Sequence, residues 1–175
     1  MGMTGEVNYV AADRPFDDWY VEARPRVAAA VALWCGSADV AADATDEAFV
    51  RLLARWNRGP SLQSPTAWVT TVAFNLVRRR ARRAALERMV LRKVRPVAAL
   101  AAPAGEVFGL VNDLPDQQRR IVLLRHVAGL SQDEIAEALK IKRSTVSSTL
   151  TDAHRRLRSL LDDDAEAPGG GRDAE

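Results

Sequence analysis

The sequence has little of the chemistry from which disulfide scaffolds, metal sites and membrane anchors are built. It holds a single cysteine, Cys35, in 175 residues, which excludes an internal disulfide and a cysteine-based zinc site. The longest apolar run, Val27 to Cys35, is too short to span a bilayer. Met1 to Glu6 lack the basic and apolar segments of a secretory signal. We expect a soluble, cytoplasmic protein with no membrane partner.

The sequence also lacks the motifs of common enzymes. It contains no Gly-rich phosphate loop and no set of metal ligands at a recognised spacing. The only two histidines, His126 and His154, fall in predicted helices, where a packed or surface role is the default, and Cys35 has no obvious partner base. The sequence therefore predicts a protein that is not an enzyme, with no catalytic residue, no cofactor and no bound metal.

Charge is strongly segregated along the chain, although the formal total is only +2. Residues 13–57 carry eight acids and five arginines, a net −3, whereas residues 58–95 carry ten basic residues and one acid, a net +9. The last fourteen residues, 162–175, carry a net −5. A basic block between acidic neighbours is a candidate footprint for a polyanion.

The N-terminal half reads as three helices, and no segment alternates like a strand. Residues 16–34 predict a helix bent near Pro25, and residues 40–56 predict a second. A third begins at Ser64-Pro65, because serine suits the N-cap and proline the first helical position. Apolar residues at three- and four-residue steps mark the buried faces: Ala44, Ala48, Phe49, Leu52, Leu53 and Trp56 on the second helix, and Trp68, Val69, Val72, Ala73 and Leu76 on the third.

Two polar surfaces lie outside these apolar stripes, an acidic one on the second helix and a basic one on the third. On the second helix Asp43 and Glu47 are four residues apart, with Asp46 beside them, away from the apolar stripe. On the third helix Asn75 and Arg78 are expected near Thr71, on the side opposite Trp68 and Val72. Trp56 and Trp68 are expected in the core rather than as platforms for stacking on bases.

The C-terminal half contains a second helical domain, expected over residues 108–161 after a linker at 96–107. Ser131 and Glu134 form a capping box at the start of a short helix. A three-residue turn around Ile141 follows, and then a long helix with Val146, Leu150, Ala153, Leu157 and Leu160 in register. Short capped helix, turn and longer helix predict a helix-turn-helix. Residues 162–175, acidic and Gly-rich, are expected to be a disordered tail.

The long final helix would enter a DNA groove by its N-terminal end. Its polar positions are short hydroxyls and arginines, which can reach bases and phosphates: Arg143, Ser144, Ser147, Ser148, Thr151 and Arg155. An ordinary antiparallel helix pair with a solvated face is the alternative. The register of the capping box, the turn and the apolar stripe favours DNA binding.

Both halves together resemble the extracytoplasmic-function (ECF) class of sigma-70 family RNA polymerase sigma factors. The fourth sigma region is matched by Leu114-Pro115, the run from Gly129 to Ala136, and Thr145-Val146. The second region is similar to Ala42 to Leu52 and to the segment that contains Ala67-Trp68-Val69 and Val72-Ala73-Phe74-Asn75. The match covers about residues 15–95 and 108–161, in the order of the family. It implies an all-α protein of two small helical domains joined by a flexible linker.

The resemblance implies a transcription initiation factor whose partners are core RNA polymerase and promoter DNA, with an anti-sigma factor as a third candidate. The acidic helix would bind a coiled coil on the largest polymerase subunit, and the C-terminal domain would meet the flap region. The site residues that follow are Asp43, Asp46 and Glu47 for polymerase, Asn75, Arg78, Arg79 and Arg82 for the −10 element, and Arg143, Ser144, Ser147, Ser148, Thr151 and Arg155 for the −35 element.

Several positions depart from the pattern of the family. Asp46 replaces the usual glutamine, and Lys140 replaces the common turn glycine. Lys142, Ser144 and Ser147 replace a capping serine, a glycine and a basic residue, so the recognition helix is unusually neutral. A helix-turn-helix regulator that acts without polymerase remains the alternative function. It has no need of the acidic helix or of the arginine-rich one.

Overall fold

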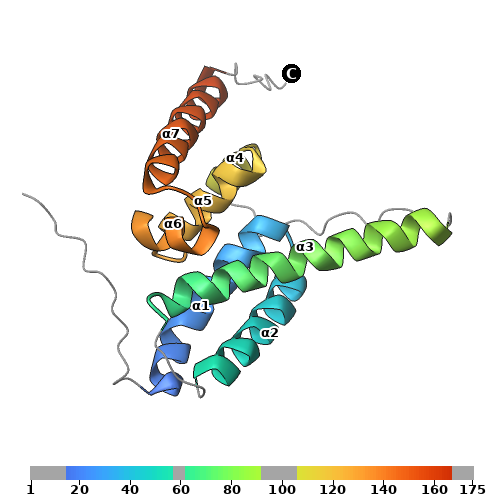
Figure 1. The fold of residues 1–175 in the computed structure, drawn as a ribbon. Coiled ribbons are helices and arrows are strands. Elements are labelled where there is room, and N and C mark those ends of the chain that lie inside the picture. Colours follow the sequence, from blue (N-terminus) through green and yellow to red (C-terminus); the bar gives the residue numbers. More distant parts are fainter. Residues whose placement is uncertain (1–14, 57–61, 92–105, 167–175) are drawn as a thin grey trace, which may run out of the picture.

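The structure is a computed structural model that describes residues 15–56, 62–91 and 106–166. Within these ranges the chain is helical and contains no strand, so the predicted all-α class is confirmed. No helix in the same ranges is long and apolar enough to cross a membrane. Figure 1 shows the seven helices, which are α1 (Phe16–Cys35), α2 (Ala38–Trp56), α3 (Pro65–Leu91), α4 (Glu106–Asn112), α5 (Asp116–His126), α6 (Gln132–Leu139) and α7 (Arg143–Glu166).

Helices α1, α2 and α3 pack around a core rich in aromatic rings. Trp19 of α1 lies with its ring centroid 5.5 Å from those of Phe49 and Trp56, both on α2. Trp34, near the end of α1, lies 4.8 Å from Phe74 of α3. Helix α1 is continuous through Pro25. Trp56 therefore packs in this aromatic cluster, in agreement with its predicted core position.

Helices α6 and α7 form the predicted helix-turn-helix, and α5 packs against both of them. The aliphatic core of these three helices includes the fully buried Ile121, Ile135 and Val146. The capping box is present: the Ser131 hydroxyl accepts from the Glu134 N–H at 3.2 Å, and the Ser131 N–H donates to the Glu134 carboxylate at 2.8 Å. Lys140 ends α6 with φ +55°, a left-handed conformation that usually selects glycine.

The two halves are in contact, because α5 packs against α1 and α6 packs against α3. In Figure 1 α2 lies on the side of α3 away from the C-terminal helices, whereas α1 crosses behind α3 and its C-terminal end reaches toward α5. The buried apolar side chains of both halves form one continuous core. The sequence predicted two domains and a linker but gave no sign of this contact. The linker residues 96–105 lie outside the described part of the chain.

Three sequence predictions of local structure need correction. Helix α7 continues to Glu166, five residues beyond the expected end at Leu161, since no glycine or proline occurs before Pro168. Helix α4 begins at Glu106, inside the expected linker. Leu53, placed in the buried stripe of α2, is 39% exposed. Residues 167–175 of the expected tail lie outside the described residues.

Candidate protein and nucleic-acid interfaces

The acidic face of α2 consists of Asp43, Asp46 and Glu47, and it lies opposite the buried residues of that helix, as predicted. The Asp43 side chain is 77% exposed. Arginines of the same chain nevertheless pair with all three acids. Arg24 of α1 donates to Asp46 at 2.9 Å, and Arg80 of α3 lies 2.9 Å from Glu47 and 3.9 Å from Asp43. The acidic face is therefore exposed but internally neutralised.

These arginine contacts were not predicted from the sequence. The hydrogen bond that Arg24 donates to the Asp46 carboxylate raises the pKa of Arg24. Because both partners of each pair remain partly exposed, one pair contributes at most about 1 kcal/mol. A basic partner protein can displace Arg24 and Arg80 at little cost. The direction of Arg80 could have been predicted from helical geometry. Arg80 follows Asn75 by five residues, which places the two side chains about 140° apart around the helix axis.

The polar face of α3 opens onto a cleft with a volume of about 740 Å³. Thr71, Asn75 and Arg78 line it, together with Trp68 and Val72. The prediction that Asn75 and Arg78 lie opposite Trp68 and Val72 is wrong, because residues seven apart on a helix return to the same face. The buried face of α3 is instead formed by Val69, Thr70, Ala73, Phe74, Leu76 and Val77.

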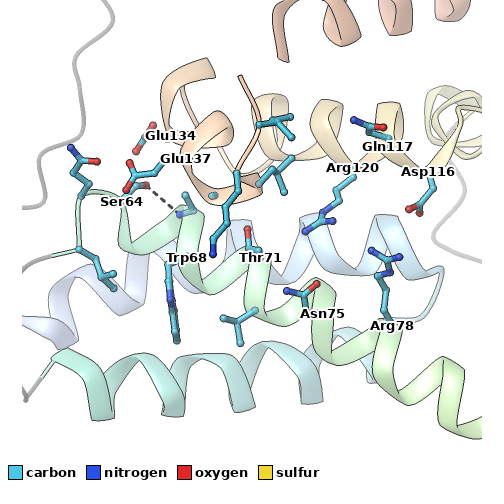
Figure 2. A pocket seen from close by; sticks show the side chains of 18 residues that line it. Ser64, Trp68, Thr71, Asn75, Arg78, Asp116, Gln117, Arg120, Glu134 and Glu137 are labelled. Atoms are coloured by element: carbon cyan, nitrogen blue, oxygen red, sulfur yellow. Dashed lines mark hydrogen bonds between the residues drawn. The ribbon is translucent and has the colours of Figure 1, made fainter. Parts of the chain in front are cut away.

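Trp68 lies at the margin of this cleft and is only partly buried. The guanidinium of Arg55, on α2, lies 5.8 Å from the centre of the indole. In Figure 2 the indole points from α3 toward α2 rather than toward the C-terminal helices. Its placement is therefore intermediate between the predicted core position and an open stacking platform.

The opposite wall of the cleft comes from the C-terminal half, through Asp116, Gln117 and Arg120 of α5 and the end of α6. Figure 2 shows Arg120 and Asp116 pointing toward α3, where Arg78 faces them. The Arg120 guanidinium lies 5.4 Å from the centre of the Phe74 ring. Burial lowers the pKa of Arg120, and the nearby charge of Arg78 lowers it further. The sequence did not indicate that these α5 residues meet the face of α3.

The arginines that follow Arg78 on α3 point in two directions, some along the face of Asn75 and one toward α2. Residues 78–86 are all exposed, and in Figure 1 this end of α3 projects beyond the other helices. Arg79 and Arg82 share the helical face of Asn75, as helical periodicity requires, whereas Arg80 turns toward α2 and the acidic face. The four predicted −10 residues thus share one side of α3, although α5 and α6 face only Asn75 and Arg78 across the cleft.

The polar face of α7 is exposed at every predicted position: Arg143, Ser144, Ser147, Ser148, Thr151 and Arg155. Its interactions are short-range. Arg143 pairs with Asp133 of α6 at 3.0 Å, and Arg155 pairs with Asp152 at 3.0 Å. The hydroxyls of Ser148 and Thr151 donate to carbonyls one turn earlier on the same helix. The face is therefore regular and accessible, with two arginines held by neighbouring acids.

The histidines and the cysteine lie outside these three surfaces. The Nε2 atoms of His126 and His154 are 3.2 Å apart. Burial, and next the charges of His154 and Arg125, lower the pKa of His126. The Cys35 thiol donates to the Ser37 carbonyl at 3.3 Å, and burial raises its pKa. In the described ranges no three potential metal ligands come together.

Family models identify both halves of the chain. The model for region 2 of sigma-70 matches residues 19–87, and the model for region 4 of sigma-70 matches residues 105–157. Together they cover more than two thirds of the sequence, in the expected order. The chain belongs to the sigma-70 family, as the resemblance implied. It is a promoter-specific sigma factor, a transcription initiation factor that associates with core RNA polymerase and promoter DNA.

Solved structures show the same fold at low sequence identity. The sigma factor RpoE from Bartonella quintana, in complex with the anti-sigma factor NepR, is similar with a TM-score of 0.69 and 19% identity, over 84% of this chain and 96% of that one. CnrH, in complex with the cytosolic domain of CnrY, is similar with a TM-score of 0.61 and 21% identity, over 85% and 88% of the two chains. No curated protein sequence matches the chain.

Proposed function

We propose that this sigma factor acts in the cytoplasm as a non-catalytic adaptor with three separate binding surfaces. The acidic face of α2 binds polymerase, the polar face of α3 binds the −10 element, and the polar face of α7 binds the −35 element. The observation that carries the proposal is that each predicted residue set lies on one accessible helical face, away from the buried apolar residues of its helix.

Asp43, Asp46 and Glu47 are proposed to receive a basic coiled coil on the largest polymerase subunit. Carboxylates that alternate with arginine partners are complementary to such a surface, and charge pairing of this kind sets orientation and association rate. On binding, arginines of polymerase replace Arg24 and Arg80. The C-terminal half is proposed to meet the flap region of the same enzyme.

Asn75, Arg78, Arg79 and Arg82 are proposed to hold the −10 element as it opens. No nucleotide cofactor is needed if the protein binds the separated strands better than the duplex, because binding then drives melting. The Asn75 amide can read the edge of an unstacked base, and the arginines can hold phosphates of the single strand. Leu62, Gln63 and Ser64, just before α3, and Ala67 and Trp68 at its start line the same cleft.

The face of α7 from Arg143 to Arg155 is proposed to lie in the major groove of the −35 element. Its hydroxyls are short, so they require close approach of the helix, and Arg143 and Arg155 supply the phosphate contacts. Only these two of the six side chains are charged. We therefore expect the −35 contact to be weaker and less salt-dependent than the −10 contact.

Run-off transcription with core polymerase and this protein alone tests the proposal. Specific transcripts should appear from a subset of a promoter panel, and they should be lost when Asn75→Ala is introduced. Binding to promoter DNA without any binding to core polymerase would instead support the helix-turn-helix regulator. Absence of both core binding and initiation over the panel would reject the proposed function.

Of the two solved structures named above, RpoE was solved with the anti-sigma factor NepR and CnrH with the cytosolic domain of CnrY. We extend the proposal to a protein inhibitor that competes with polymerase for this chain. Pull-down of core polymerase by the protein should then fall as the inhibitor is added, and unchanged recovery would reject that role for the added protein.

A further inference from the structure

The two histidines of the chain meet in the C-terminal helical unit. His126 is the last residue of α5, His154 lies in the middle of α7, and 28 positions separate them along the sequence. Their Nε2 atoms are 3.2 Å apart, and their ring centroids are 5.4 Å apart. Because the sequence holds only these two histidines, any chemistry of this chain that needs two imidazoles is confined to this place.

The packing of α5 against α7 brings the two rings together. Val122, one turn before His126, is buried, and Ala153, next to His154, is fully buried. The two helices are in direct contact. Both imidazoles are nevertheless exposed, so small solutes can reach the Nε2 atoms from solvent. The pair is therefore held by a packed core and open to ligands.

The separation of the two nitrogens suits two ligands of one metal ion. Bonds of about 2.0–2.1 Å to Zn²⁺ and a tetrahedral angle place two imidazole nitrogens about 3.3–3.4 Å apart, close to the 3.2 Å observed here. Imidazole nitrogen also binds Ni²⁺ and Cu²⁺, whereas Mg²⁺ and Ca²⁺ require oxygen ligands. This pair of donors therefore selects a divalent transition metal ion.

The two rings share one hydrogen bond, in which the Nε2–H of one imidazole donates to the Nε2 of the other. A metal ion would replace this bond. The Nε2 proton moves to Nδ1 of the same ring, which leaves both Nε2 lone pairs free to bind the ion. No proton is gained or lost overall. Small rotations of two exposed side chains then direct both lone pairs at the ion.

The surroundings of the pair favour weak, reversible binding. Within the described residues no third histidine, cysteine or carboxylate joins the two imidazoles, so water would complete the coordination. Arg125 adds a positive charge beside His126, although its guanidinium is bonded to the Leu130 carbonyl at 2.9 Å. A closed structural site has four protein ligands. The pair is instead suited to an ion that exchanges with solvent.

We propose that His126 and His154 form a two-histidine site for a divalent transition metal ion such as Zn²⁺ or Ni²⁺, which clamps α5 to α7. The two rings are adjacent only in the folded unit, so the ion stabilises the C-terminal helices by binding the folded state preferentially. The site revises the expectation from the sequence that the chain binds no metal. It does not depend on the roles proposed for α2, α3 and α7.

Titration of the full chain, purified without a histidine tag, with ZnCl₂ tests the site. Calorimetry measures the stoichiometry and affinity, and circular dichroism measures the midpoint of urea unfolding with and without zinc. His126→Gln and His154→Gln each remove one imidazole and keep a polar side chain. Cys35→Ser is the control, because it removes the free thiol of α1, the remaining soft ligand of the chain.

Wild-type protein should bind one zinc ion per chain, and zinc should move the urea midpoint to a higher concentration. Loss of one histidine should lower the affinity about tenfold or more, since loss of even an outer-shell partner of a metal ligand commonly costs 10–100-fold. The midpoint shift should disappear in both glutamine variants. Cys35→Ser should match wild type, and MgCl₂ or CaCl₂ should leave the midpoint unchanged.

Four results would overturn the inference. The first is no binding heat and no midpoint shift in a large excess of zinc, which would leave the pair as a hydrogen bond only. The second is equal zinc affinity in wild type and in either glutamine variant. The third is binding that occurs only together with dimerisation, measured by light scattering, because the ligands would then come from different copies. The fourth needs no substitution: unchanged ¹⁵N resonances of both imidazoles when zinc is added to wild-type protein.

Discussion

The two halves of the molecule are both helical units, but their cores are built from different side chains. Eight aromatic residues lie in α1, α2 and α3, with rings in mutual contact around Trp19. The core of α5, α6 and α7 contains no aromatic ring and relies on Ile121, Leu124, Ile135 and Val146. The first half is stabilised by large rings, and the second depends more on precise helix ends such as the Ser131 cap.

The charged surfaces of the two halves also differ, in how far apart along the sequence their ion-paired residues lie. On α2 the ion pairs join residues 22 and 33 positions apart, Arg24 with Asp46 and Arg80 with Glu47, so they exist only in the folded unit. On α7 the pair of Arg155 with Asp152 lies within one turn. The acidic face of α2 is thus held mainly by contacts between distant helices, whereas the polar face of α7 has one pair within its own helix and one pair, Arg143 with Asp133, to the neighbouring α6.

Core truncation gives the largest expected effects and tests the difference between the cores. Trp19→Ala should lower the free energy of unfolding of the first half by about 3–5 kcal/mol, and Ile135→Ala that of the second by about 2–5 kcal/mol. All four tryptophans lie in the first half. The midpoint of urea unfolding, measured by tryptophan fluorescence, should therefore fall to a lower urea concentration in Trp19→Ala. For Ile135→Ala we expect the midpoint to shift when unfolding is measured by circular dichroism but not when it is measured by tryptophan fluorescence. Identical midpoint shifts by both probes would mean that the halves unfold as one unit.

Charge reversal on the acidic face should have the next largest effect. Asp43→Arg should weaken binding to core polymerase about tenfold or more, because it places a cation against a basic surface. Helicity should stay unchanged, since Asp43 is exposed and its contact with Arg80 is 3.9 Å long. Affinity is measured by titration with labelled core enzyme. Asp113→Arg, the same reversal on an exposed turn of the other half, is the control, and equal losses in both would contradict a specific role.

The arginines of α3 offer an internal comparison of direction. Arg78→Gln should lower the slope of log affinity against log salt, for promoter binding by the assembled holoenzyme, by about 0.7–0.9. Arg80→Gln should leave that slope unchanged, because Arg80 lies about 140° around α3 from Asn75 and so faces away from the DNA path. The measurement is a filter-binding series at increasing salt. A fall in slope for Arg80→Gln as large as for Arg78→Gln would remove the distinction between the two directions.

The smallest expected effect lies at the turn of the helix-turn-helix. Lys140→Gly should raise the stability of the second half by about 0.5–1 kcal/mol, because a left-handed residue with a Cβ is strained. Thermal unfolding by circular dichroism measures the gain. Ser131→Ala, which removes the cap at the other end of α6, should lower stability by about 1 kcal/mol. A loss of stability in Lys140→Gly would show that the lysine side chain compensates for the strain.

The helices and their caps were predictable because their causes are local. Periodicity identified α2, α3 and α7, and the spacing of Ser131 and Glu134 identified the start of α6. The candidate residues on α7 and α2 were placed correctly on exposed faces for the same reason. The error over Trp68 and Asn75 was also local, since helical geometry alone places residues seven apart on one side.

Other features could not be read from the sequence, because they depend on which surfaces meet. Arg24 and Arg80 were unremarkable among 25 basic residues until α1 and α3 brought them to the acidic face. Leu53 matched the apolar stripe of α2, yet no neighbour covers it fully. Helix α7 also extends past its expected end at Leu161, since helix ends are the least reliable part of a prediction.

The sequence by itself determined the class of fold, the order of the two sigma regions and the residues on each polar face, because these follow from helical periodicity and short-range capping. Only the tertiary structure decided that α5 and α6 lie against α3, with Trp34 bound to Asp116 and Arg120 over Phe74. The physical reason is that interactions between residues 46 to 82 positions apart leave no periodic trace in a sequence. That contact places α5 and α6 across a cleft from Asn75 and Arg78 of α3.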